Sequence, residues 1–277
     1  MAPYRASSLP AESSAETFKI TDSQYGVTGA LWRCPACGFL ECPEMSGVLA
    51  FYEALEDPAY EESRPARQIQ ERRLLEAVRR LRPNGRLLDV GAASGALVEQ
   101  AAGLGYEAEG VEPSRWLREK AAARGLRVHL GTLPHPDARG PFDVVTLVDV
   151  LEHIPRPIAV LEEIRRVLAP GGLVAVATPD ASSVAARVFG RRWWHFRAGH
   201  VGYFNLRNLD LLFGRAGFRR VGWQRPSWYF GLDYLASRLK RYFPFPGRMP
   251  AFFRKVIVPV NLGDSLLVFY VQKGTPA

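Results

Sequence analysis

The sequence lacks any apolar run close to the roughly 18 residues that a membrane-spanning helix needs. Its opening segment, MAPYRASSLPAESSAE, also lacks the apolar core of a secretory signal peptide. The first absence argues against a membrane-spanning protein and the second against a secreted one, so the sequence predicts a cytoplasmic protein. Because residues 1–15 are rich in Ser, Ala and Pro, we expect them to be disordered.

Cysteine is scarce: the chain has three, Cys34, Cys37 and Cys42. Thiols this close together are not a disulfide framework, and C-x-x-C-G is typical of one zinc knuckle. A structural zinc needs four ligands, however, and residues 1–33 contain no Cys or His. We therefore expect residues 16–60 to be a degenerate zinc-ribbon-like segment, in which zinc at Cys34 and Cys37 is not favoured, and we predict no metal ligands. A redox C-x-x-C is less favoured still, because no thioredoxin-like unit follows.

The formal net charge of +8 would suit nucleic acid, an anionic membrane surface or an acidic substrate. The arginines are scattered, with clusters at residues 72–73, 79–82 and 191–197, as is typical of solvated helix surfaces. We therefore expect no nucleic-acid partner. The charge and the aromatic C-terminal part favour a peripheral contact with an amphiphilic or anionic substrate. The oligomeric state stays open.

Beyond residue 64, predicted helices and strands alternate. The predicted helices cover 65–81, 95–103, 114–124, 157–168 and 208–216. The predicted strands cover 86–90, 107–111, 126–130, 143–148, 173–178, 218–224 and 265–272. Such alternation predicts an α/β fold with a doubly wound parallel sheet. Before it, we expect short strands at 18–20 and 30–33 and a linker or short helix at 51–64.

A glycine loop follows the first strand of this pattern, in residues 87–95 (LLDVGAASG). Ligands of parallel sheets bind at the carboxyl ends of the strands, and glycines let the backbone approach them closely. The dinucleotide fingerprint G-x-G-x-x-G is absent, which argues against an NAD(P)-dependent oxidoreductase. An acid at Asp89 would repel a phosphate but suits an ammonium group. Glu112, at the end of the next strand, can accept both hydroxyl protons of a ribose.

Together these segments resemble the class I S-adenosylmethionine-dependent methyltransferases. Besides the glycine loop, GVEPS at 110–114, VTLVDVLEHIP at 145–155 and LAPGGLVAVATP at 168–179 are similar to motifs of that family. The resemblance covers residues 65–225. It implies a Rossmann-like methyltransferase sheet of seven mostly parallel strands, within a domain over residues 61–277. Residues 180–206 and 226–262 would be acceptor-site or lid insertions in that domain.

The resemblance also implies a set of cofactor-binding residues. These are Asp89, Gly91, Ser94, Gly95, Glu112, Pro113, Thr132, Leu133 and Asp149. Asp89 and the Gly91 backbone would hold the methionine ammonium, and Glu112 would hold the ribose. Thr132 and Leu133 would lie beside adenine, and Asp149 would line the methionine side.

Methyl transfer from a sulfonium mainly needs orientation of the reactants, and an oxygen acceptor also gains from a general base. His153 and His200 are the candidate bases, each with a structural role as the alternative. We expect His195 to be surface or lid, and His129 and His135 to be inert. The aromatic residues at 193–196 and 223–230 would either wall an apolar acceptor pocket or pack as ordinary core.

The sequence therefore predicts transfer of the methyl group of S-adenosylmethionine to a small-molecule acceptor, with S-adenosylhomocysteine as the product. The acceptor oxygen or carbon would belong to a natural-product, sugar or lipid-linked intermediate. The alternatives are a non-catalytic cofactor-binding scaffold, an NAD(P)-dependent oxidoreductase, and a relative that recognises RNA or protein through its N-terminal module. No Asn-Pro-Pro-Tyr-type sequence follows residue 148, which argues against methylation of amino groups on bases or glutamine.

Overall fold

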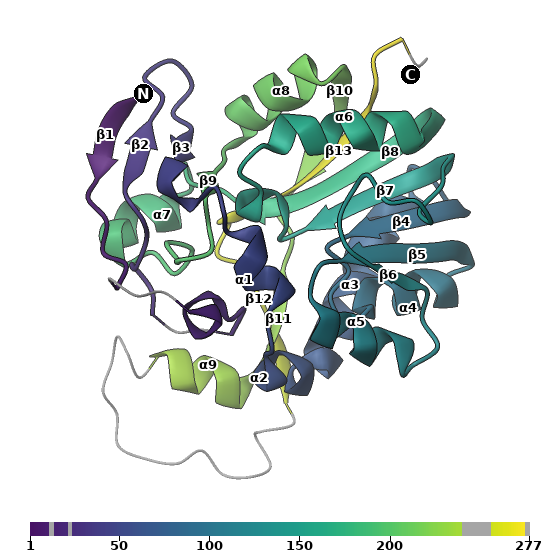
Figure 1. Cartoon of the computed structure of the whole chain (residues 1–277), viewed down its shortest axis with the longest axis horizontal. Helices are drawn as coiled ribbons and strands as arrows, with labels where there is room; N and C mark the ends of the chain where they lie inside the picture. Colours follow the sequence, from purple (N-terminus) through teal and green to yellow (C-terminus); the bar gives the residue numbers. More distant parts are fainter. Residues whose placement is uncertain (11–13, 22–23, 240–255, 275–277) are drawn as a thin grey trace.

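The computed structural model describes residues 1–10, 14–21, 24–239 and 256–274, and a seven-stranded sheet forms its centre (Figure 1). The strand order is β10-β13-β8-β7-β4-β5-β6. The strands are β4 (Gly85–Val90), β5 (Tyr106–Glu112), β6 (Val128–Leu130), β7 (Phe142–Val148), β8 (Leu168–Pro179), β10 (Phe218–Gln224) and β13 (Ser265–Gln272). Within this sheet β13 is antiparallel to both of its neighbours, and the other pairs are parallel. The predicted sheet of seven mostly parallel strands is confirmed.

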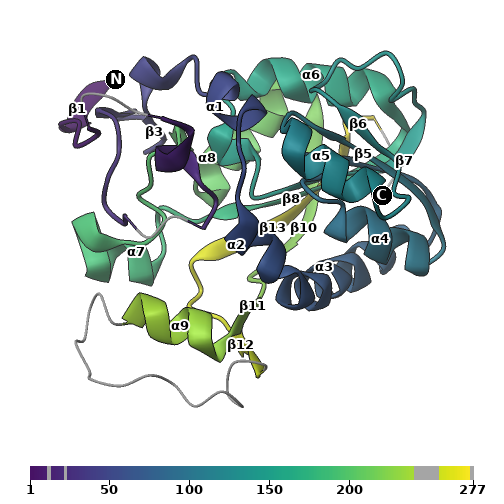
Figure 2. The ribbon, with the colours of Figure 1, turned by 60° about the horizontal axis from the view of Figure 1, so that its bottom comes forward.

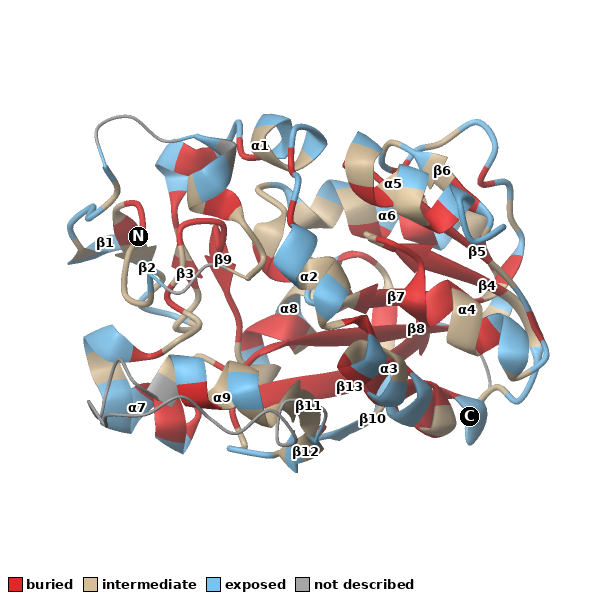
Figure 3. Cartoon of the chain, turned by 90° about the horizontal axis from the view of Figure 1, so that it is seen from below, coloured by how far each residue is buried: buried red, intermediate tan, exposed pale blue. Residues whose placement is uncertain are grey.

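Helices cover both faces of this sheet, because alternate residues of each apolar strand point to opposite sides. On β4, Leu88 and Val90 join the core beneath α6 and α8, whereas Leu87 joins the core beneath α3 and α4. These helices and their neighbour α5 are α3 (Arg64–Arg79), α4 (Ala96–Gly103), α5 (Arg115–Ala122), α6 (Pro157–Val167) and α8 (Leu206–Arg215). Figure 3 shows the buried residues concentrated in the central strands.

The predicted boundaries agree with these elements to within two residues, with one exception. Strand β8 begins at Leu168 and not at 173. The reason is the pairing of Leu168 with Phe142, which extends the sheet backwards across the irregularity that follows. The local pattern of Pro and Gly at 170–172 indicated only the end of the helix.

The N-terminal segment shares a small antiparallel sheet with residues 180–206, the segment that the family resemblance predicts to be an insertion. Its order is β1-β2-β3-β9, with β1 (Ala2–Arg5), β2 (Leu31–Arg33), β3 (Leu40–Glu41) and β9 (Gly202–Tyr203). Phe18 and Leu31 pack in one core with Trp193 and Phe196. Figure 2 shows the two segments side by side next to the large sheet, together with α7 (Val184–Phe189).

Two expectations for the N-terminal segment are wrong. Residues 1–15 were expected to be disordered, but β1 pairs with β2, which gives its backbone groups hydrogen-bond partners; residues 11–13 lie outside the described part. The strand expected at 18–20 is replaced by the 3-10 helix η1 (Ala15–Phe18). Phe18 is buried against Phe51 by ring stacking at 4.2 Å and not by strand pairing.

The remaining connections contain short elements. Before α3 lie α1 (Leu49–Glu53) and α2 (Pro58–Glu62), which agree with the short helix expected at 51–64. The insertion expected at 226–262 contains β11 (Trp228–Gly231), α9 (Leu232–Leu239) and β12 (Ile257–Val260), and its residues 240–255 lie outside the described residues. Among the helices that the structure describes, none is both long enough and apolar enough to span a bilayer.

Candidate functional site

A cavity of about 640 Å³ lies at the carboxyl ends of β4, β5, β6 and β7. The strand ends contribute Gly91, Glu112, Thr132 and Asp149 to its lining, and Pro113 and Leu133 line it beside them. The N-terminal segment contributes residues 17–20, Tyr52 and Tyr60, and the insertion contributes His195 and residues 197–200. The cavity is therefore closed by segments distant in the sequence from the strands that form its floor.

The glycine loop leaves no space for side chains at two of its positions. Gly91 has φ +75°, and a Cβ atom there would lie 2.5 Å from Cγ2 of Val150. Gly95 has φ +78°, and its Cβ would lie 2.7 Å from Cδ1 of Leu126. Ser94 is buried, and its carbonyl and hydroxyl oxygens accept hydrogen bonds from Arg64 at 2.9 and 3.0 Å. Gly91 thus lines the cavity, whereas Ser94 and Gly95 support the loop from behind.

Glu112 is buried at the end of β5 with its carboxylate held by two backbone donors. Oε2 accepts a hydrogen bond from the Ala93 N–H at 2.8 Å, and Oε1 accepts one from the Ser114 N–H at 2.7 Å. Burial raises the pKa of Glu112 to about 7, although both hydrogen bonds lower it. Each oxygen keeps a further lone pair, so the carboxylate is oriented and can still accept two hydroxyl protons.

The other two predicted carboxyl groups occupy different positions. Asp149 lines the cavity in the left-handed region, with φ +52°, and burial raises its pKa to about 7 while Arg197 lowers it. Asp89 is not among the cavity-lining residues: its Oδ1 accepts a hydrogen bond from Thr146 Oγ1 at 2.6 Å. Burial also raises the pKa of Asp89 to about 7. Asp89 therefore lies one layer behind the position that the resemblance implied.

His153 lies in the cavity wall with one ring nitrogen fixed. Nδ1 lies 2.8 Å from the Gly199 carbonyl oxygen and 2.5 Å from the Tyr52 hydroxyl. A carbonyl can only accept, so the network assigns the proton to Nδ1 and leaves the lone pair on Nε2. Burial lowers the pKa of His153 to about 4, which keeps the ring neutral at neutral pH. The arrangement is that of an oriented, neutral imidazole able to accept a proton.

His200 stacks edge-on against His153, with 4.7 Å between the ring centroids. It is buried, its pKa is lowered well below the usual value by burial, and its Nδ1 has no hydrogen-bond partner among the described residues. Glu152 Oε2 accepts a hydrogen bond from Thr178 at 2.9 Å, while Oε1 is also without a described partner. Ligand atoms of Glu152, His153 and His200 lie within 4.8 Å of one another, so these groups could share a proton or a cation.

Comparison with known proteins identifies the family to which this chain belongs. Residues 60–221, more than half of the chain, match a family model described as a methyltransferase domain. The chain belongs to this methyltransferase family. The resemblance to class I S-adenosylmethionine-dependent methyltransferases is thereby confirmed, and with it the cofactor of the family.

Curated relatives of this methyltransferase include ubiquinone biosynthesis O-methyltransferases. The one from Caulobacter sp. (strain K31) is 38% identical over 103 residues, which cover 34% of this chain and 40% of that protein. The one from Bradyrhizobium sp. (strain ORS 278) is 32% identical over 123 residues, which cover 42% of this chain and 45% of that protein. The matched segments span less than half of either relative.

Solved structures share the fold at low sequence identity. A chain in the complex between the Haloferax volcanii Trm112 methyltransferase activator and a methyltransferase has a TM-score of 0.55 at 19% identity, covering 84% of this chain and 99% of that chain. Magnesium protoporphyrin IX methyltransferase from Synechocystis PCC 6803, solved with bound S-adenosylhomocysteine, has a TM-score of 0.50 at 13% identity, covering 79% and 90%.

Helix α3 of the methyltransferase brings residues to the cavity that the sequence analysis missed: Arg67, Gln70 and Glu71. Burial, together with the charges of Asp89 and Asp149, raises the pKa of Glu71 well above its usual value. Glu71 Oε2 and the Nε and Nη2 atoms of Arg67 have no hydrogen-bond partner in the described part of the chain. A signal was present, because Glu71 precedes the buried Leu75 by one helical turn and so places a charge on the apolar face.

The aromatic segments have a different role from the proposed acceptor wall. Trp193 is fully buried, and its Nε1–H donates to Asp264 Oδ2 at 3.3 Å. Neither Trp193, Trp194 nor Phe196 lines the cavity, and none of residues 223–230 does. The interpretation as a pocket wall is therefore wrong for these residues, and they pack as core or lie at the surface. Their hydrophobicity alone could not distinguish the two uses.

The three cysteines do not gather into a metal site in the described residues. Cys34 and Cys37 lie in the turn between β2 and β3, where the Gly38 N–H donates to the Cys34 carbonyl at 2.9 Å. Cys42 is buried, and burial raises the pKa of its thiol to about 11, which disfavours the thiolate that a metal needs. The described clusters of three or more metal-binding groups contain His, Asp and Glu only. The pKa of Cys34 is lowered by the backbone N–H groups of Cys37 and Ala36, so among the three thiols it is Cys42 that is unsuited to be a ligand.

The ligand-free methyltransferase is expected to lose stability as the pH rises from 6.5 to 8. Asp89, Glu112 and Asp149 have folded pKa values of about 7, whereas unfolded carboxyl groups titrate near 4. The folded state therefore binds protons that the unfolded chain does not, and this stabilisation is complete below pH ~4 and lost as the pH rises through 7. The lowered pKa of His153 makes stability rise with pH, but only below about pH 6.5, where the unfolded imidazole binds a proton that the folded one does not. Thermal unfolding across this range should show a falling Tm, and a rising Tm would contradict the assigned burial.

Proposed function

We propose that this chain transfers the methyl group of S-adenosylmethionine to an acidic hydroxyl, a phenol or catechol, of a small molecule. The observation that carries the proposal is a neutral His153 with a fixed tautomer in the wall of the same cavity as Glu112. The cofactor would supply a methyl group already activated on its sulfonium. The protein has then to bind, orient and deprotonate the acceptor.

The residues of the cavity fit this cofactor. Glu112 would accept the two ribose hydroxyls, and Thr132 and Leu133 would lie against adenine. The amino-acid end carries an ammonium and a carboxylate, and α3 offers an acceptor for the first in Glu71, whose Oε2 lacks a described partner, and a cation for the second in Arg67. Arg67 is already ion-paired with Glu61 at 3.6 Å, so Glu71 is the buried group of this pair that a ligand donor would satisfy. Asp89 would act from the second layer and Asp149 from the cavity wall.

His153 would take the proton of the acceptor hydroxyl at Nε2. The Gly199 carbonyl and the Tyr52 hydroxyl hold Nδ1 and so keep the lone pair on the opposite nitrogen. Residues 197–200 of the insertion also line the cavity, and we propose that the 180–206 segment completes the acceptor site. In this proposal, residues of the strand ends and of α3 position the cofactor. The 180–206 segment and Tyr52 position His153.

The strength of the base narrows the class of acceptor. With its pKa lowered to about 4, His153 is a weak base. A phenolic hydroxyl, with a pKa near 10, is within reach of a positioned weak base, whereas a sugar hydroxyl is far less acidic. The relatives named as O-methyltransferases of ubiquinone biosynthesis support oxygen as the acceptor atom. Phenol and catechol acceptors are therefore favoured over sugars and over carbon.

A pair of matched acceptors tests this function. We expect the protein with S-adenosylmethionine to convert catechol into its methyl ether, detected by mass spectrometry, and to leave trans-1,2-cyclohexanediol unchanged. The two diols have similar size and spacing, but only the first is acidic. Methylation of the aliphatic diol at a similar rate, or of a ring carbon, would overturn the assignment. Binding of S-adenosylhomocysteine without turnover of any phenol would instead support the scaffold alternative.

A further inference from the structure

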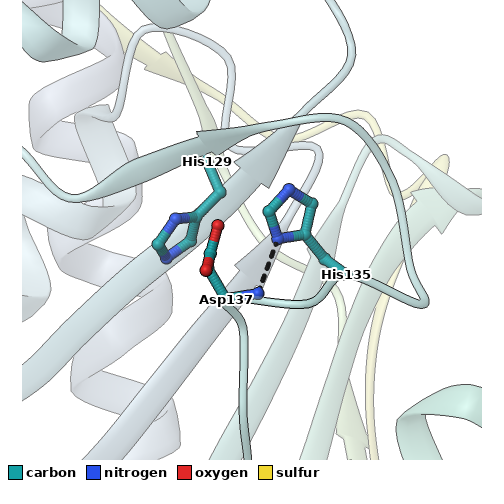
Figure 4. Close-up of side chains that lie close together, drawn as sticks. All are labelled: His129, His135 and Asp137. Carbon is teal, nitrogen blue, oxygen red and sulfur yellow. Dashed lines mark hydrogen bonds between the residues drawn. The ribbon is translucent and has the colours of Figure 1, made fainter.

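A second cluster of metal-binding side chains lies outside the cavity, at β6 and the loop that follows it. His129 is on β6, and His135 and Asp137 are on the loop. Figure 4 shows the three side chains turned toward one another, with the Asp137 carboxylate between the two imidazole rings. One ligand atom from each residue lies within 4.8 Å of the others, and the ring centroids are 5.2 Å apart. We propose that these three residues bind a divalent transition-metal ion, with zinc the best match.

The outer hydrogen bonds of both histidines support this site. His129 Nε2 lies 3.0 Å from Glu109 Oε2, and His135 Nε2 lies 3.2 Å from the Leu130 carbonyl oxygen. Both partners accept hydrogen bonds, so they assign a proton to each Nε2 and leave each Nδ1 with a lone pair. Metal-binding histidines characteristically donate their other N–H to a carboxylate or a backbone carbonyl in this way.

The acceptor Glu109 is itself held in place. It is buried, and Arg86 Nη2 donates to its Oε1 at 3.2 Å. The lone pair of His135 Nδ1 accepts one hydrogen bond, from the Asp137 backbone N–H at 3.2 Å. On metal binding, a bond from His135 Nδ1 to the metal would replace this single long hydrogen bond. The site is thus preorganised on the His129 side and adjustable on the loop side.

The ligand set selects the metal. Two imidazole nitrogens and one carboxylate oxygen suit zinc, whereas magnesium and calcium prefer oxygen ligands alone. His129 and His135 are partly exposed and Asp137 is exposed, so water can fill the fourth position of a tetrahedral site. The same loop carries Thr132 and Leu133 into the cavity, and a metal would therefore fix the loop at both of its ends.

Calorimetric titration of the full chain with zinc chloride tests the site. The titration is done in a Cys34→Ser/Cys37→Ser background, so that the thiols cannot contribute. We expect zinc to bind and the imidazole C–H NMR signals of His129 and His135 to shift on binding. Asp137→Asn and His135→Gln should each weaken binding by about tenfold or more, and Glu109→Gln by about tenfold through His129.

Glu107→Gln is the matched control, because Glu107 lies on the same strand as Glu109 but is exposed and does not contact either histidine in the described contacts. It should leave zinc affinity unchanged, and circular dichroism should show that every variant is folded. The proposal is overturned if Asp137→Asn and His135→Gln bind zinc as tightly as the background protein. It is also overturned if zinc binding disappears when the cysteines are replaced.

Discussion

Replacing His153 with glutamine is expected to lower kcat for phenolic acceptors by about 10²–10⁴-fold, the range that a positioned general base contributes. Affinity for S-adenosylhomocysteine should stay close to that of the unmodified protein, because His153 is assigned to the acceptor and not to the cofactor. Glutamine keeps a donor for the Gly199 carbonyl but has no basic nitrogen. Initial rates with catechol and calorimetric titration with S-adenosylhomocysteine measure the two quantities separately.

A series of phenols of differing acidity distinguishes a base from a merely structural histidine. Nitro-substituted phenols are largely ionised without help, so the loss caused by His153→Gln should shrink as the acceptor becomes more acidic. Tyr52→Phe should give a smaller loss, because the Gly199 carbonyl still holds Nδ1. If His153→Gln lowers the rate equally for every phenol, the residue only supports the cavity wall and the proposed base is wrong.

Replacing Glu112 with alanine is expected to weaken binding of S-adenosylhomocysteine by more than about tenfold. Hydrogen bonds to charged groups contribute about 1.5–3 kcal/mol each, and tenfold corresponds to ~1.4 kcal/mol. The variant loses both proposed ribose contacts. It also leaves the N–H groups of Ala93 and Ser114 without their acceptor, which loosens the turn beside Gly91. Calorimetry gives the affinity directly.

Two further variants make this result interpretable. Glu112→Gln keeps the shape of the side chain and tests the charge alone, should the alanine variant fail to fold. Glu107→Ala, on the exposed part of the same strand, should bind S-adenosylhomocysteine normally. An alanine variant at position 112 with unchanged affinity, or a protein that binds NADH in preference to S-adenosylhomocysteine, would refute the cofactor site.

Local patterns were sufficient to predict the central sheet and the strand ends of the site. The apolar run of β7 and the glycines after β4 are features of neighbouring residues, and parallel strands bring their carboxyl ends to one edge of the sheet. These patterns predict that the glycine loop and Glu112 lie at one site, and the family resemblance adds Asp149 to it. Gly91, Glu112 and Asp149 each line the cavity.

Only the tertiary structure could show what closes the cavity and what holds His153, the proposed base. Tyr52 meets His153 across 101 residues of sequence, and β3 pairs with β9 across an even longer separation. The tertiary structure also places Asp89 behind the cavity and places Arg67 and Glu71 in the cavity wall. Contacts between distant segments depend on how side chains of many elements pack together, and no periodicity within one segment carries that information. The sequence by itself determined the fold of this methyltransferase and the strand ends that line its cavity, whereas the packing of the N-terminal segment against residues 180–206 decided which residues close the cavity.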